Sequence, residues 1–125
     1  MKKLNTLYWL KQERIQIENQ IKELTVLSAV SMSGMPGGNR VSSPVERFNE
    51  RLEQLTEKLQ RKCAEILTET ERIEEYIENI EDAEVRVIAR KRFIENKTFQ
   101  AIGDEMYIEK TTAYKKLKRY LERVV

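Results

Sequence analysis

A seven-residue repeat of branched apolar side chains limits most strongly what this 125-residue chain can fold into. The repeat consists of Leu52, Leu59, Ile66, Ile73 and Ile80. Because this spacing keeps side chains on one face of an α-helix, it predicts one long helix from about 44 to 80. Cys63 lies close to the same stripe, and we expect it to be a small buried residue. One helix cannot bury such a stripe alone, so a partner helix is required.

The residues before the repeat indicate where this helix begins. Ser43 suits the N-cap position, and Pro44 has the fixed φ of a first helical residue. Glu46 follows Ser43 by three residues and completes a capping box.

A second apolar stripe precedes the long helix. It comprises Leu7, Leu10, Ile17, Ile21 and Leu24, and its spacing of three and four predicts a helix from about 4 to 28. We expect Trp9 to pack on this helix. Residues 31–43 hold three of the four glycines, which predicts a flexible loop. Residues 1–80 therefore form either an antiparallel hairpin or an intermolecular coiled coil, and the pattern allows both.

A separate all-helical unit is predicted for residues 81–125. Asp82 suits the cap of a third helix that runs to about residue 95. Its buried face consists of Val85, Ile88, Ala89 and Phe93. Thr98 suits the cap of a short fourth helix, and the turn over residues 107–109 leads into a last helix from Lys110 to Tyr120.

The last helix is basic on the side that faces away from its apolar residues. Ala113, Leu117 and Leu121 recur every four residues and should face the core. The outer face then carries Lys110, Thr111, Tyr114, Lys115 and Lys118. Since the major groove of DNA admits one α-helix, a tight corner with a basic second arm is typical of a helix-turn-helix.

Charge is segregated along the chain although the net charge is only +2. Residues 1–43 carry six basic and three acidic residues, residues 44–85 six and thirteen, and residues 86–125 eleven and five. A polyanion would therefore meet the C-terminal segment. The chain has no histidine and one cysteine, so we expect no enzyme, no metal site and no cofactor.

The segment "EDAEVRVIARKRFIENKTFQAIGDEMYIEKTTAYKKLKRYL", residues 81–121, resembles the region 4 helix-turn-helix of sigma factors. Together with the capped long helix and the glycine-rich loop, it is similar to phage activators of late transcription of the ArpU and RinA type. The resemblance implies a phage-type transcriptional activator that binds double-stranded promoter DNA and contacts host RNA polymerase. Tyr107 and Glu109 replace the glycine and serine usual in that turn, so Tyr107 requires another turn geometry or a strained φ.

The resemblance assigns the DNA contacts position by position. Thr111, Tyr114 and Lys115 match positions that touch base edges, and their side chains are able to bond bases in the major groove. Lys110 matches a position near the phosphates. Lys97, Thr98, Lys118 and Arg119 are also expected at phosphates, which add affinity without sequence information.

Two other functions fit the same pattern. A small terminase subunit for DNA packaging also joins a helix-turn-helix to helical oligomerisation segments. A structural or adaptor protein would use the coiled coil itself, and a homodimer through it is open in each case. No stretch is long and apolar enough to span a membrane, and we expect a protein of the host bacterial cytoplasm without a membrane partner.

Overall fold

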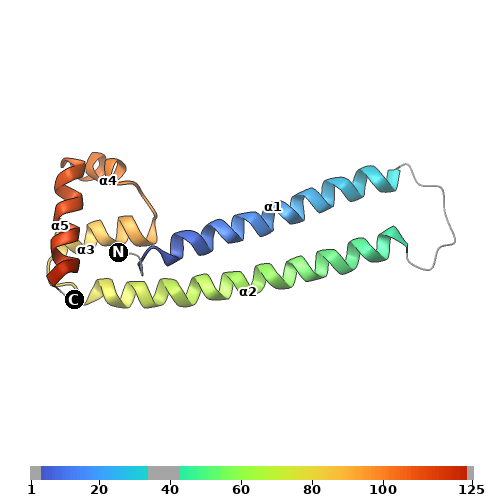
Figure 1. Ribbon diagram of the computed structural model, residues 1–125, viewed down its shortest axis with the longest axis horizontal. Coiled ribbons are helices and arrows are strands. Elements are labelled where there is room, and N and C mark those ends of the chain that lie inside the picture. The colour runs from blue at the N-terminus through green and yellow to red at the C-terminus, as the bar shows by residue number, and fades with distance from the viewer. Residues whose placement is uncertain (1–3, 34–42, 124–125) are drawn as a thin grey trace. The chain divides into compact units, whose positions relative to one another are not determined.

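The computed structural model describes residues 4–33 and 43–123, and every element in them is helical (Figure 1). The predicted all-α fold class is confirmed. In chain order, the elements are α1 (Thr6–Ser33), α2 (Pro44–Glu78), α3 (Ala83–Ala89), the π-helix η2 (Arg90–Ile94), α4 (Phe99–Met106) and α5 (Lys110–Arg123). No helix in these two ranges has the length and apolar character that crossing a membrane requires.

Helices α1 and α2 form an antiparallel hairpin within one chain (Figure 1). The alternative that the sequence left open, in which α1 and α2 pair only between chains, is therefore not the arrangement seen. Helix α1 continues past the predicted end near residue 28 to Ser33, because residues 28–33 contain neither Gly nor Pro. Residues 31–33 of the predicted flexible loop are thus helical, and its residues 34–42 lie outside the described chain.

Helix α2 begins at the predicted cap. The backbone N–H of Glu46 donates to the Ser43 hydroxyl oxygen at 3.1 Å. At the other end, the side chain of Arg86 donates to the carbonyls of Ile80 and Glu81 at 2.6 and 3.1 Å. Because these carbonyls follow the last turn of α2, Arg86 fixes the sharp passage into α3.

Contacts divide the chain into two compact units. The hairpin unit is Leu10–Glu65, and the corner unit comprises the chain up to Trp9 together with the chain from Ile66 onward. Among the described residues of the hairpin unit, only Leu55 is fully buried.

Cys63 is exposed, so the prediction of a buried cysteine is wrong. Its neighbour Lys62 is partly buried instead, and the Lys62 ammonium lies 3.6 Å from the carboxylate of Glu13 on α1. The spacing of three and four that faces a partner helix runs through Leu55, Leu59, Lys62 and Ile66, whereas Cys63 lies one position after Lys62.

The corner unit has a continuous apolar core. The four residues predicted for the buried face of α3 are all buried, and they pack with residues of α4 and α5. The core of these helices is Val85, Ile88, Ala89, Phe93, Ile102, Ala113 and Leu117. The predicted third helix is present, but its second half widens into the π-helix η2, which nothing in the residue pattern marks.

Trp9 does not pack into this core. Its side chain is 64% exposed, and it meets the Tyr8 ring edge-on at 5.0 Å between centroids. The expectation that Trp9 packs inside is therefore wrong. Leu4 and Leu7 take the buried positions of this turn, and a residue two places after Leu7 points to the other side of the helix.

A candidate nucleic-acid interface

Helix α4 begins at the predicted cap. The Thr98 hydroxyl oxygen accepts a hydrogen bond from the backbone N–H of Ala101 at 3.1 Å. The backbone of Thr98 is extended, as an N-cap requires. Just before it, Asn96 ends η2 with a left-handed backbone, φ 58°, so the chain turns sharply between the two helices.

Helices α4 and α5 cross so closely that their corner has room for glycine only. A Cβ atom on Gly103 would lie 2.6 Å from the carbonyl oxygen of Ile108 and 3.1 Å from the backbone nitrogen of Lys110. The close approach of the two helices therefore requires glycine at position 103. Tyr107 closes α4 with φ 59° and ψ 40°, the strained alternative of the two that the sequence allowed.

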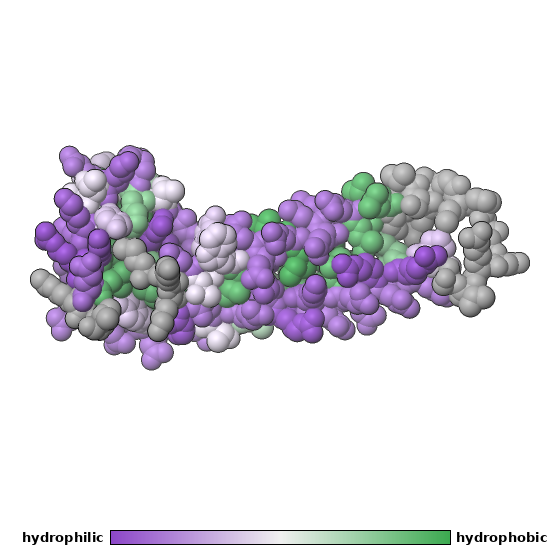
Figure 2. Space-filling view, in the orientation of Figure 1, coloured by the Kyte–Doolittle hydropathy of each residue, from purple (hydrophilic) through white to green (hydrophobic). Residues whose placement is uncertain are grey.

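The outer face of α5 projects into solvent. Lys110, Thr111, Tyr114, Lys115 and Lys118, which we call the basic face, are all exposed, and Arg119 is exposed beside them. On the opposite side, Ala113 and Leu117 are fully buried. In Figure 2, the surface over α5 at the left is mostly hydrophilic. The partition that the four-residue spacing predicted is therefore present.

Several cations of this helix have no acidic partner among the described residues. Within residues 4–33 and 43–123, no ion pair involves Lys110, Lys115 or Arg119. Lys116 pairs with Glu84 on α3 at 2.7 Å, and the Lys118 ammonium lies 4.0 Å from the Glu122 carboxylate. The positive potential is thus concentrated on the outer side, where a polyanion would approach.

Tyr114 is held in place by a chain of ring contacts from η2 to α5. The Arg92 guanidinium lies over the Phe99 ring at 4.6 Å from its centroid. Phe99 meets Tyr114 edge-on, with centroids 5.3 Å apart and an interplanar angle of 89°. The Lys118 ammonium lies over the Tyr114 ring, 5.7 Å from its centroid. These contacts fix the Tyr114 ring on the basic face while its hydroxyl remains available.

Two of the predicted phosphate contacts already have partners within the protein. Lys97 pairs with Glu105 on α4 and, at 3.1 Å, with Glu95. The hydrogen bond to Glu105, followed by that to Glu95, raises the pKa of Lys97. The hydrogen bonds from Lys97 and then from Lys91 lower the pKa of Glu105. Thr98 is engaged as the cap of α4.

The eight predicted contact residues therefore fall into two groups. Six of them lie along the exposed side of α5, whereas Lys97 and Thr98 precede α4. Sequence reasoning missed the role of Arg92 and the orientation of Phe99 towards Tyr114. No pattern in the sequence pairs Phe99 with Arg92.

Residues 4–33 and 43–123 define an all-α fold in which two closely crossed helices form a corner and the second of them is cationic and exposed. Residues 37–124 match the family described as "Protein of unknown function (DUF1492)", and the chain belongs to that family. The match covers α2 and every later helix of the chain. The search of curated proteins and the search of solved structures both found no match.

Proposed function

We propose that this protein is a double-stranded DNA-binding transcriptional regulator of the phage type, which reads the major groove with α5. The observation that carries the proposal is the exposed cationic face of α5. The opposite side of this helix is buried, and a tight corner joins the helix to α4. Such a helix can enter the groove while the remaining helices of its unit stay outside.

The basic face supplies two kinds of contact. Thr111, Tyr114 and Lys115 lie within two turns on one side of α5, and in this proposal they meet base edges. Lys110, Lys118 and Arg119 surround them and neutralise phosphates. The Thr98 hydroxyl can donate to a phosphate oxygen while its oxygen still caps α4. Lys97 would be shared between a phosphate and Glu105.

The further parts of the proposal rest on the resemblance to ArpU- and RinA-type activators. By that resemblance, the protein activates transcription through contact with host RNA polymerase in the bacterial cytoplasm. It acts by binding, without enzymatic activity.

The test is fluorescence anisotropy of the full-length protein with fragments from its own genomic neighbourhood, against random duplex, at about 50 and 200 mM salt. We expect one fragment to be retained with a steep salt dependence. Lys115→Ala should weaken that specific complex by about 1 to 3 kcal/mol and relax base choice. Lys118→Ala should weaken all sequences alike and lower the salt slope.

Lys58→Ala is the matched control, because Lys58 is an exposed lysine of α2 in the hairpin unit. It should leave affinity and salt slope unchanged. Equal losses on specific and random duplex for Lys115→Ala would contradict base reading. Absence of binding at about 50 mM salt would contradict the whole proposal.

One observation favours a second function, that of a coiled-coil adaptor. Val26 and Leu27 are 62% and 64% exposed near the end of α1, where Figure 2 shows a hydrophobic patch. Exposed apolar side chains next to each other are typical of a protein contact. Loss of self-association or partner binding in Val26→Ser, together with no affinity for DNA, would support this alternative.

A further inference from the structure

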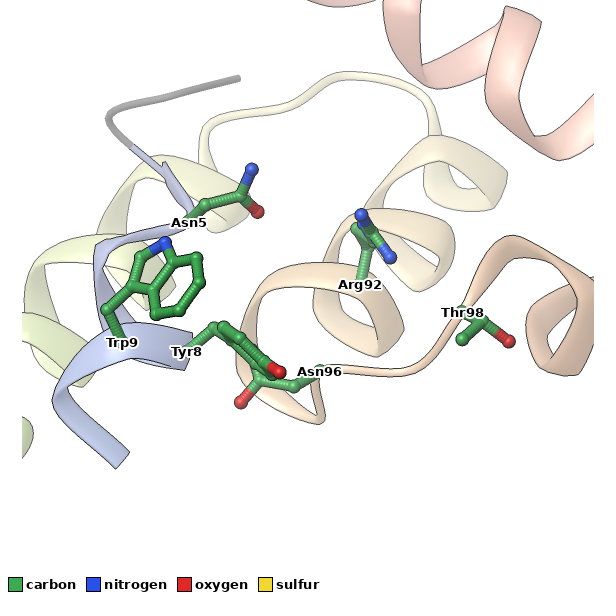
Figure 3. Close-up of a pocket in the computed structure, with 6 residues that line it drawn as sticks. All are labelled: Asn5, Tyr8, Trp9, Arg92, Asn96 and Thr98. Carbon is green, nitrogen blue, oxygen red and sulfur yellow. The ribbon is translucent and has the colours of Figure 1, made fainter. Parts of the chain in front are cut away.

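A cavity of about 320 Å³ opens within the corner unit, and none of its lining residues belongs to the basic face of α5. Three segments contribute to it (Figure 3): the start of α1, η2 with its last turn, and the cap of α4. It is lined by Asn5, Tyr8, Trp9, Arg92, Asn96 and Thr98. Its volume is at the small end of the ~300 to 1,000 Å³ that small-molecule sites occupy.

The aromatic side of the cavity offers an open ring face. Tyr8 and Trp9 stand nearly perpendicular to each other, at 79°. Trp9 is largely exposed, although an indole of this size normally contributes much to a core. A flat ring that stacked on Trp9 would meet Tyr8 at its edge, so the two side chains form a corner suited to a planar heterocycle.

The remaining lining is rich in hydrogen-bond donors and contains no carboxylate. Arg92 uses one N–H to bond the Lys97 carbonyl at 3.0 Å, and its guanidinium carries five such donors. Asn96 donates to the Phe93 carbonyl at 3.3 Å, which leaves its own amide oxygen as an acceptor. The Asn5 amide offers both donors and an acceptor, as the edge of a nucleobase does.

We infer that this cavity binds a nucleotide, with the base stacked on Trp9 and the phosphate bonded by Arg92. The Trp9 ring suits the face of a base, and the amides of Asn5 and Asn96 suit its edge. The Arg92 guanidinium, with no carboxylate in the lining, suits the phosphate. The nucleotide comes either from the free pool or from a single strand of nucleic acid. The inference does not depend on duplex binding by α5, since only Thr98 is common to the two sets of residues.

Trp9 is the only tryptophan of the chain, so its fluorescence reports directly on this cavity. Full-length protein is titrated with adenosine and guanosine monophosphate, with adenosine, with inorganic phosphate and with short oligothymidylate. Free tryptophanamide titrated in parallel corrects for absorption by the bases. We expect saturable quenching by a monophosphate below about 1 mM, and at least tenfold weaker binding of the nucleoside and of phosphate alone.

Two variants place the ligand. Arg92→Gln should weaken binding of the monophosphate at least tenfold and leave the weak nucleoside binding unchanged. Arg90→Gln is the matched control, since Arg90 is an exposed arginine of the same π-helix that does not line the cavity. Asn5→Ala, which leaves the Arg92–Lys97 bond intact, provides a second loss of affinity if Arg92→Gln unfolds.

The two sources of the nucleotide give different results. Tighter quenching by oligothymidylate than by any monophosphate, retained in Lys115→Ala, assigns the cavity to single-stranded nucleic acid. Quenching by the monophosphate alone assigns it to a free nucleotide. No quenching by any ligand, or quenching equal in wild type, Arg92→Gln and Asn5→Ala, would overturn the inference.

Discussion

At the scale of single residues, two residues of the corner unit have a left-handed backbone conformation although neither is glycine. Asn96 has φ 58° and Tyr107 φ 59°. Asparagine tolerates this region, whereas for tyrosine it costs about 1 kcal/mol. The Tyr107 side chain is 94% exposed, so little packing compensates the strain.

Tyr107→Gly should therefore raise the free energy of unfolding of the corner unit by about 1 kcal/mol. Urea denaturation followed by Trp9 fluorescence measures it, because Trp9 lies in the same unit. Tyr107→Ala is the control: it removes the same ring but keeps a Cβ, and it should leave stability nearly unchanged. An equal gain from both variants would mean that the ring, and not the backbone, carries the strain.

Gly103 lies at the opposite extreme, because its lack of a side chain is required by space. Gly103→Ala should lower the free energy of unfolding by about 1 to 3 kcal/mol, since a backbone carbonyl occupies the position of the new Cβ. The same urea titration tests it. A substitution without effect would indicate that α4 and α5 separate easily, which would weaken the case for a rigid corner.

Glu105 makes the stability of the corner unit depend on pH. Its folded-state pKa lies below the ordinary value of 4.5, because Lys97 and Lys91 bond the carboxylate. A lowered acid pKa contributes stability above the unfolded pKa, and this contribution is lost as pH falls through the folded pKa. Glu105→Gln should therefore be less stable than wild type near neutral pH, and the difference should vanish in acid.

Asp104→Asn is the control for this pH profile, since Asp104 bonds Gln100 and no lysine among the described residues. The difference in stability between Asp104→Asn and wild type should not disappear as the pH falls. If Glu105→Gln remains less stable than wild type at acid pH, the effect comes from packing and not from the carboxylate charge.

At the scale of the elements, α4 depends on its cap because its eight residues are too few for a helix stable by itself. Thr98→Ala removes the hydroxyl that bonds the Ala101 N–H and should cost about 1 kcal/mol. Thr98→Ser keeps the hydroxyl and should keep most of the stability. The same pair of variants tests the proposed phosphate contact. Thr98→Ser should keep the affinity for duplex DNA as it keeps most of the stability.

The contrast between caps and side-chain burial explains how much of this fold the sequence predicted. Ser43, Asp82 and Thr98 act within four residues of their positions, so local spacing identified all three helix starts. Burial depends on a second element, and reasoning from one helix misplaced Cys63 and Trp9.

The candidate interface likewise has features that the sequence of one helix predicts and features that depend on several elements. The periodicity of α5 was sufficient to predict its exposed cationic side, because that property belongs to one helix. The chain of rings from Arg92 through Phe99 to Tyr114 joins three elements. The nucleotide cavity joins the start of α1 to residues more than eighty positions later, and no spacing rule relates them.

At the scale of the whole molecule, the two units differ in how completely they bury their side chains. Among the described residues, the hairpin unit buries only Leu55. The corner unit buries Ile66, Ile73 and Ile77 of α2 together with the core residues of its later helices. Two paired helices leave half of each helix in water, so the apolar area removed from water per residue is smaller in the hairpin unit.

This difference predicts a step in stability along α2, although it is one continuous helix. Local opening requires less free energy where fewer apolar contacts are lost. The backbone amides of residues 45–65 should therefore exchange hydrogen faster than those of residues 66–78. Hydrogen exchange measured by mass spectrometry on the full chain should place the step close to Ile66. Leu55→Ala should accelerate exchange before the step and leave the later residues unchanged. Uniform protection along α2, or acceleration of both parts by Leu55→Ala, would mean that the two units unfold as one.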